Sequence, residues 1–235
     1  DIAKYYRTFH QLRTTPMGQL RRLIYRLFQK RRVQWVTRFL SKGTILDVGA
    51  GEGTFAAMLP ARFSVTSIEA PFAQELPEWI YKIDFLGWNP NKRFDAVVFW
   101  ESLEHVAEPQ AYLVKAASVL KKGGYLFIEY PRFDSLESRI FGFRWYHLDV
   151  PRHLSHLTGE GLGVLLSRAG LTTQASQSVF APEYAIIGCI ASTIGVNAGT
   201  RIMSRSRVFL LIVALFLAPV ALVYEISAAF WRQSP

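Results

Sequence analysis

The chain has 235 residues, half of them hydrophobic, which suits one α/β domain with an appendage and excludes a disordered protein. Its single cysteine, Cys189, excludes an internal disulfide, and the sequence has no CxxC pair of the kind found in zinc ribbons. The net charge of +9 comes from residues 1–42, which hold 11 Lys or Arg and one acid, so we expect no nucleic-acid groove built by the whole fold and no nucleic-acid partner.

A basic amphipathic helix is predicted over residues 17–40, within an N-terminal helical region that we place at 1–42. Apolar residues recur at helical spacing with arginines between them, and Pro16 suits the first turn. Two interpretations remain open. The helix either packs on a domain edge with a solvated basic face, or lies on an anionic lipid surface.

Short apolar runs alternate with helical stretches between residues 43 and 180. Strands are expected at 44–48, 64–70, 95–100 and 124–130, with a short one near residue 83 and another over 171–180, and helices at 109–122 and 158–170. Near-continuous apolar strands separated by helices indicate a parallel sheet covered on both faces. The sequence therefore predicts an α/β domain over 43–180.

The stretch ILDVGAGEGTF, residues 45–55, has the glycines of a nucleotide-type loop at Gly49, Gly51 and Gly53. A P-loop would need Gly-Lys-Ser/Thr, which is missing here. A dinucleotide fingerprint would need glycine where Thr54 stands, and Glu52 would repel a pyrophosphate. S-adenosylmethionine has no phosphate and carries a positive sulfonium, so an acidic loop suits it better.

Acids follow the successive strands. Asp47 precedes the loop, Glu69 ends the second strand where it can accept ribose hydroxyls, and Asp84 can accept an adenine amine. Phe85 would lie against the adenine ring, and Glu101 at the end of the fourth strand completes the expected cofactor-binding set. One acid at a strand end is ordinary. Acids in this order around a glycine loop favour a binding site.

Five segments in this order, ILDVGAGEG, IEA, IDF, FDAVVFWESLEHV and LKKGGYLFIEYP, resemble the motifs of class I S-adenosylmethionine-dependent methyltransferases over about residues 43–175. WESLEHV and HLDVPRHLSHLTGEGLGVLLSRAGL resemble the ubiquinone-biosynthesis O-methyltransferases and their broad bacterial relatives. The resemblance implies a Rossmann-like sheet of seven strands with an antiparallel last strand. Nothing after residue 224 reads as that strand.

Transfer to a hydroxyl needs a base, and histidine is the usual one at neutral pH. We expect His153, in DVPRHLSH, to be that base and His105, just past the fourth strand, to be the next candidate, although a capping role would explain His153 as well. In the ubiquinone-type relatives the matching Glu, Glu and His are credited with a divalent cation. By that resemblance Glu101, Glu104 and His105 could hold Mg²⁺. The alternative is that Glu104 and His105 merely begin a helix.

Aromatic residues in FGFRWYHL suggest an acceptor pocket. Phe143, Trp145 and Tyr146 would wall it, and ordinary core packing would explain them equally well.

Residues 208–224 form 17 consecutive residues without a charge, preceded by Arg201, Arg205 and Arg207. A spanning helix needs about 20 apolar residues, and Pro219 would kink one here. We therefore expect 181–235 to associate with a membrane, as a re-entrant hairpin rather than a span, with the arginines and the catalytic domain on the cytoplasmic side. A buried core helix is the competing interpretation.

The leading functional hypothesis is an S-adenosylmethionine-dependent methyltransferase, O-directed, acting on a hydrophobic, lipid-linked or membrane-embedded acceptor at the membrane surface. One alternative is a membrane-anchored protein that binds the cofactor without transferring its methyl group. Another is an NAD-type oxidoreductase, which the glycine spacing and Glu52 disfavour.

Overall fold

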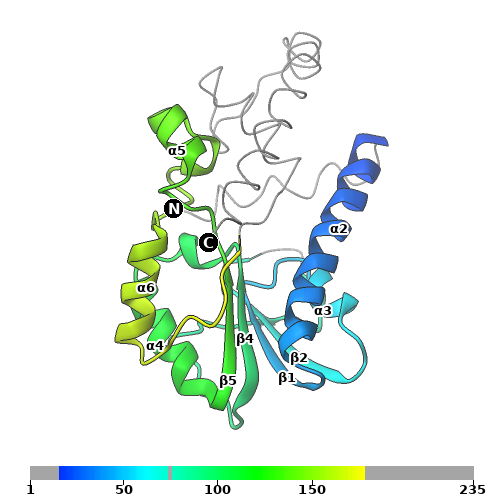
Figure 1. Ribbon diagram of the computed structural model, residues 1–235. Coiled ribbons are helices and arrows are strands. Elements are labelled where there is room, and N and C mark those ends of the chain that lie inside the picture. Colours follow the sequence, from blue (N-terminus) through cyan, green and yellow to red (C-terminus); the bar gives the residue numbers. More distant parts are fainter. Residues whose placement is uncertain (1–15, 74–75, 178–235) are drawn as a thin grey trace.

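A computed structural model describes residues 16–73 and 76–177 of the chain, with side chains from residue 25 onward (Figure 1). The expected membrane segment at 208–224 lies outside these residues. Within the described part of the chain, no helix combines the length and the apolar character that crossing a bilayer requires.

Five parallel strands form the sheet, in the order β3-β2-β1-β4-β5. They are β1 (Gly43–Val48), β2 (Phe63–Glu69), β3 (Tyr81–Lys82), β4 (Phe94–Trp100) and β5 (Leu120–Glu129). Strands β2 and β3 follow β1 on one side of it, and β4 and β5 then lie on its other side. The order therefore reverses between β1 and β4, where open α/β sheets bind ligands at the carboxyl ends of their strands.

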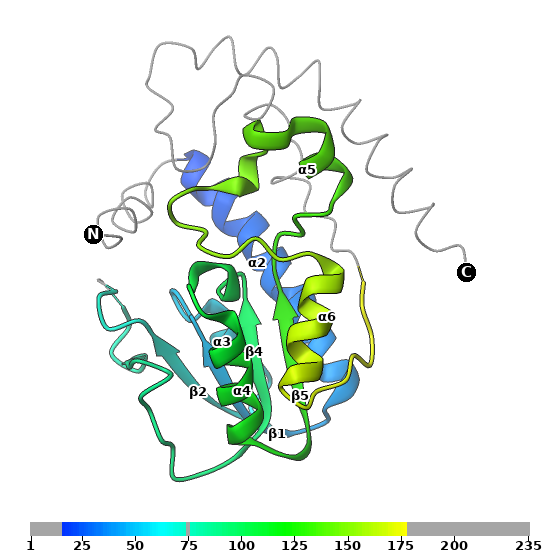
Figure 2. The same cartoon turned by 90° about the vertical axis from the view of Figure 1, so that its left-hand side faces the viewer.

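Helices cover both faces of the sheet, as the sequence predicted (Figures 1 and 2). One face carries α2 (Pro16–Phe39) and α3 (Thr54–Met58), and the other carries α4 (Pro109–Val119) and α6 (Gly159–Arg168). Short helices follow β4 and β5: η2 (Leu103–His105), α5 (Leu136–Phe141), η3 (Gly142–Arg144) and η4 (Tyr146–Leu148). The last three project beyond the carboxyl ends of the strands (Figure 2).

Two apolar layers enclose the sheet because strand side chains alternate between its faces. Along β4, Val97 and Phe99 join the layer under α4 and α6, whereas Val98 and Trp100 join the layer under α2 and α3. All four are buried. This two-sided burial explains why the strand reads as a continuous apolar run in the sequence.

Helix α6 begins and ends at the predicted residues. The Thr158 hydroxyl accepts a hydrogen bond from the Gly161 amide at 2.9 Å, which caps the first turn. At the other end Gly170 adopts a positive φ of 73°, the conformation that ends many helices.

Two boundaries differ from the predictions. Helix α4 ends at Val119 rather than at Lys122, because Leu120 already pairs with Phe94 as the first residue of β5. The strand predicted over 171–180 is wrong for residues 171–177, which form no regular element. They line one wall of the cavity beside β5 instead of pairing with it.

The second half of α2 packs on the sheet. Val36 is fully buried, and the Phe39 ring lies 5.8 Å from the Phe127 ring of β5. Arg32 is only 7% exposed, so one of the arginines expected on a solvated face points into the domain. This half of the helix therefore packs on the sheet, but with Arg32 buried rather than on a solvated basic face, and contact with lipid stays a prediction.

Candidate active site

The glycine loop lies at the carboxyl end of β1, and its three glycines have positive φ values of 78° at Gly49, 55° at Gly51 and 72° at Gly53. A Cβ at Gly53 would lie 2.1 Å from the Trp79 ring, and a Cβ at Gly49 would lie 2.5 Å from the Ser102 Cβ. A Cβ at Gly51 would meet nothing within 4 Å. Gly49 and Gly53 are thus required by the fold itself, and Gly51 is the place where a ligand can approach bare backbone.

Asp47 lies beneath this loop with 1% of its surface exposed. Burial raises the pKa of its carboxyl to about 7, the nearby Arg32 charge lowers it, and Glu69 raises it further. Its Oδ2 atom is buried without a hydrogen-bond partner among the residues that the structure describes. A buried, unpartnered carboxylate oxygen is costly, so it marks the position that a cationic or hydrogen-bond-donating part of a ligand would satisfy.

Glu69 joins the loop to β2. Its Oε2 accepts a hydrogen bond from the Gly51 amide at 2.8 Å, and its Oε1 accepts one from the Ala70 amide at 2.8 Å. The structure therefore brings together the two acids that the sequence placed on either side of the loop. Because these amides hold the carboxylate in one orientation, its remaining lone pairs are available in a fixed geometry.

The third acid and its neighbour are arranged differently. Asp84 is exposed and accepts a hydrogen bond from the Leu86 amide at 3.3 Å. Phe85 is buried in the core, with its ring 6.0 Å from Phe99 and 5.6 Å from Tyr112. Its faces are occupied by core packing, so the expected stacking of Phe85 on an adenine ring does not fit this position. The aromatic ring beside the loop is that of Trp79, nearly half exposed, which the sequence analysis missed.

Glu101 begins the loop after β4 with a φ of 52°, an uncommon value for a residue other than glycine. Its amide donates to the Glu129 carbonyl at 2.8 Å, and its carboxylate accepts from Arg32 Nη2 at 3.2 Å. Arg32 Nε also donates to Glu129 Oε2 at 2.7 Å. Burial would lower the pKa of Arg32, but the charges of Glu129 and Glu101 outweigh burial and raise it. The guanidinium thus ties α2 to the ends of β4 and β5.

Arg32 was not among the predicted site residues, although the sequence holds a signal for it. It follows Phe28 by four residues and precedes Val36 by four, so all three share one face of the helix. A cation in the middle of an apolar stripe predicts a buried partner.

A second cluster of titratable side chains lies just past the carboxyl end of β4. Glu104 and His105 are the last two residues of the single turn η2, so they do not begin a helix, and His153 comes from the loop before α6. The two imidazole rings meet edge to face with centroids 4.7 Å apart. His105 Nδ1 lies 3.0 Å from the Arg152 carbonyl oxygen, and His153 Nδ1 lies 2.7 Å from that of His147. These backbone contacts fix the orientation of both rings.

The expected magnesium ligands are not brought together. One ligand atom each from Glu104, His105 and His153 lies within 4.8 Å of the others, whereas Glu101 is paired with Arg32. Mg²⁺ prefers oxygen ligands, and this cluster offers two imidazole nitrogens and one carboxylate that burial holds well above its usual pKa. Glu101 is an ion-pair partner of Arg32 in this arrangement, and a role for it as a ligand of Mg²⁺ stays a prediction.

The two candidate bases differ in accessibility. His153 is buried, and burial together with the nearby His105 lowers the pKa of His153 to about 3. Burial also lowers the pKa of His105, but that side chain is only partly covered. A group with a pKa near 3 is a weak base at neutral pH. The geometry favours His105 over His153 as the residue that removes a proton.

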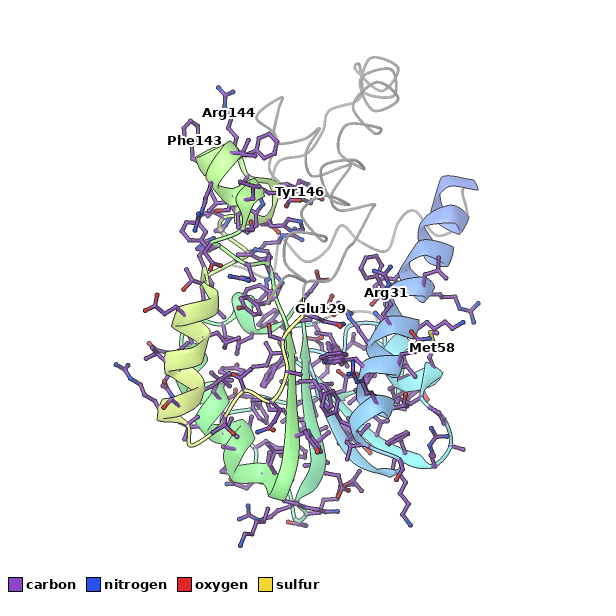
Figure 3. All side chains as sticks on the ribbon, in the orientation of Figure 1. Arg31, Met58, Glu129, Phe143, Arg144 and Tyr146 are labelled. Atoms are coloured by element: carbon purple, nitrogen blue, oxygen red, sulfur yellow. The ribbon has the colours of Figure 1, made fainter. Side chains whose placement is uncertain are left out.

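A cavity of about 1540 Å³ lies along the outer edge of β5, between α2 and α6. It does not include the glycine loop, but it reaches the site through Arg32, Glu101 and Glu129. Trp145 borders it but is only 3% exposed, so the alternative of core packing fits this residue as well, whereas Phe143 is 81% exposed at the tip of the projecting helices (Figure 3). Its lining mixes aromatic and apolar side chains with charged ones next to the end of β4.

Comparisons with known proteins agree with this fold. A family model described as a methyltransferase domain matches residues 11–176. A ubiquinone biosynthesis O-methyltransferase from Dinoroseobacter shibae is 29% identical over 190 residues, which cover 66% of this chain and 75% of that protein. An uncharacterized methyltransferase from Mycobacterium tuberculosis is 30% identical over 95 residues, or 36% of this chain and 48% of that protein. The chain thus matches about half the length of the mycobacterial relatives.

Among solved structures, an O-methyltransferase family protein from Burkholderia thailandensis has a TM-score of 0.51 and 15% identity. The alignment covers 65% of this chain and 53% of that one, and it shows a shared fold.

Proposed function

Because the chain belongs to the methyltransferase-domain family, we propose that it transfers the methyl group of S-adenosylmethionine to an oxygen of a hydrophobic, lipid-borne acceptor. The observation that carries the proposal is the unpartnered Asp47 carboxylate oxygen, buried beneath a glycine loop that Glu69 holds in place. A family match alone would not distinguish a working site from a degenerate one, and a buried, unpartnered carboxyl beside the glycine loop supports a working site.

The residues fit the cofactor. When bound, S-adenosylmethionine supplies an electrophilic methyl group on a positively charged sulfur. In this proposal Asp47 accepts a hydrogen bond from its ammonium group, and Glu69 accepts hydrogen bonds from its ribose hydroxyls. Gly51 allows close approach of the ligand to the backbone. Arg32 keeps Glu101 and Glu129 oriented at the adjoining strand ends, so that the rim of the site is preorganised.

An acceptor hydroxyl must lose its proton as its oxygen bonds to the methyl carbon, while the bond from that carbon to sulfur breaks. We assign proton removal to His105, which lies just past the carboxyl end of β4 and is held by the Arg152 carbonyl. The His153 ring packs edge-on against His105 and is a positioning residue in this proposal. Glu104, beside them, would provide a neutral carboxyl rather than a charge, since burial raises its pKa.

The choice of a lipid-borne acceptor is supported by the sequence and by the relatives. Residues 208–224 are uncharged and follow three arginines, which favours membrane association with the catalytic domain on the cytoplasmic side. The similar proteins from Dinoroseobacter shibae and Rickettsia prowazekii are named for ubiquinone biosynthesis. The cavity beside the site combines apolar and aromatic side chains with charged ones, a lining that can take an acceptor with a polar head group and an apolar tail.

Two measurements test the proposal. Calorimetric titration with S-adenosylhomocysteine and with NAD should give binding of the first only. Incubation with methyl-labelled S-adenosylmethionine and a detergent-dispersed lipid extract should place label in an organic-soluble product, stoichiometric with S-adenosylhomocysteine formed. Binding without any labelled product from lipid or water-soluble extracts would instead indicate a cofactor-binding protein that transfers nothing.

A further inference from the structure

The projecting segment of residues 133–148, which we call the arm, presents apolar side chains to solvent. Leu136 and Ile140 are 42% and 60% exposed, and they share one face of α5 because they are four residues apart. Phe143, in the next turn, is 81% exposed. A single exposed apolar side chain needs no explanation, but three on consecutive turns of one projection form a patch that has a cost in water.

Two arginines lie beside this patch, and the acidic residue of α5 is Glu137 in its first turn. Arg139 and Arg144 are exposed, and the Arg144 guanidinium lies 5.8 Å from the centre of the Phe143 ring. Phe143 and Arg144 occupy the outermost point of the arm and point away from the domain (Figure 3). Apolar side chains at the tip with arginines beside them are typical of a surface that enters the interface of an anionic bilayer, where the rings reach the acyl chains and the guanidinium groups stay among the phosphates.

A second basic surface faces the same way. The first half of α2 also extends past the carboxyl ends of the strands, across the molecule from the arm (Figures 1 and 2). Arg26 near the end of this half is exposed, as are Lys30 and Arg31 in the next turn, and α2 contains no acidic residue. The arm and α2 therefore flank the end of the sheet that holds the candidate site. One positively charged surface lies on each side of that site.

The path of the chain points to the same face. Residues 171–177 run beside β5 and reach its carboxyl end (Figure 1). The sequence that follows includes the uncharged stretch 208–224. The chain therefore leaves the described domain at the end from which the arm projects.

We propose that the arm is a membrane-docking element, in which Leu136, Ile140 and Phe143 insert into an anionic lipid surface and turn the site toward it. The inference rests on the proposed lipid-borne acceptor, whose reactive head group would then enter the site from the bilayer. Docking would lower the entropic cost of bringing a membrane-held acceptor to the domain.

The test uses the full chain with Cys189→Ser and a single new cysteine, Phe143→Cys, labelled with an environment-sensitive nitrobenzoxadiazole dye. Val114→Cys is the matched control, because Val114 is also apolar and 49% exposed but lies on α4 away from the arm. On vesicles of phosphatidylcholine with phosphatidylglycerol, we expect a blue shift and quenching by acyl-chain nitroxides at position 143 and neither at 114. Arg139→Glu with Arg144→Glu should reduce the shift on anionic vesicles more than on pure phosphatidylcholine.

Docking by the arm would be overturned if the protein co-sediments with the vesicles while the dye at position 143 keeps a water-like emission. Failure of the protein to bind these vesicles would overturn it as well. A blue shift without vesicles that grows with protein concentration would assign the patch to contact between copies of the chain. Turnover on detergent-dispersed extract is measured separately, so loss of the docking inference and loss of the proposed activity give different results.

Discussion

Asp47→Asn should stabilise the empty protein and weaken cofactor binding, two effects of opposite sign from one buried carboxyl. The pKa of Asp47 is raised to about 7 in the folded protein, mainly by burial, against about 3.9 in an unfolded chain. Between these values the unfolded chain has lost the proton and the folded chain has kept it. The free energy of unfolding therefore falls as pH rises from about 4 to about 7, and the loss is complete above that.

The size of the effect follows from the shift. About three pKa units correspond to about 4 kcal/mol, which is an upper bound for the cost of the charge at pH 8. The asparagine side chain would itself be buried without a hydrogen-bond partner, which costs roughly 1–3 kcal/mol and offsets part of this gain. We expect the variant to be about 1–3 kcal/mol more stable than the parent at pH 8, with a smaller gain at pH 5.5, measured by urea unfolding without ligand.

Cofactor binding should show the reverse. An ammonium group pairs with Asp47 only when the carboxyl is ionised, so affinity for S-adenosylhomocysteine should rise up to about tenfold per pH unit below pH 7 and then level off. Asp47→Asn should lose about 1.5–3 kcal/mol of binding at pH 8 and most of this pH dependence. Calorimetry in two buffers of different ionisation enthalpy would detect the proton released on binding.

Asp95→Asn is the control. Asp95 lies at the other end of β4, where hydrogen bonds from Lys121 and Thr44 lower its pKa to about 2. That substitution should destabilise the protein at neutral pH and leave affinity unchanged. The reasoning about Asp47 fails if its Asn variant binds like the parent, or if the parent's affinity does not depend on pH.

Three further substitutions test the site. Arg32→Gln strands the Glu129 carboxylate and should cost about 3–5 kcal/mol of stability at pH 8 and less at pH 5, by urea unfolding; an unchanged midpoint would mean that the ion pair holds nothing together. His105→Ala should keep S-adenosylhomocysteine binding and abolish turnover, whereas His153→Ala should leave measurable turnover with an altered pH–rate profile, and the opposite ranking would return the base to His153. Gly51→Ala should cost about 1–2 kcal/mol through its positive φ and weaken S-adenosylhomocysteine beyond that amount, because the methyl group would occupy the open side of the loop; binding at the parental level would exclude that approach.

Several features of this protein could be predicted from the sequence because they depend on short-range rules. Side chains that alternate between two buried faces make β4 an unbroken apolar run, and Thr158 and Gly170 mark the ends of α6 through local capping. Parallel strands present their carboxyl ends at one edge, so acids that end β1 and β2 were expected to meet at the glycine loop. Asp47, Glu69 and Gly51 do meet there.

Only the tertiary structure decided which distant residues became partners. Arg32 pairs with Glu101 and Glu129, which lie 69 and 97 positions away, and no local pattern in the sequence indicated that pairing. His153 joins Glu104 and His105 across the loop before α6, where burial makes it a weak base. Spacing along a chain shows which face of a helix or strand a residue occupies. The burial, the neighbouring charges and the pKa of that residue depend on what the fold packs against the face, and those contacts come from segments that local patterns do not connect.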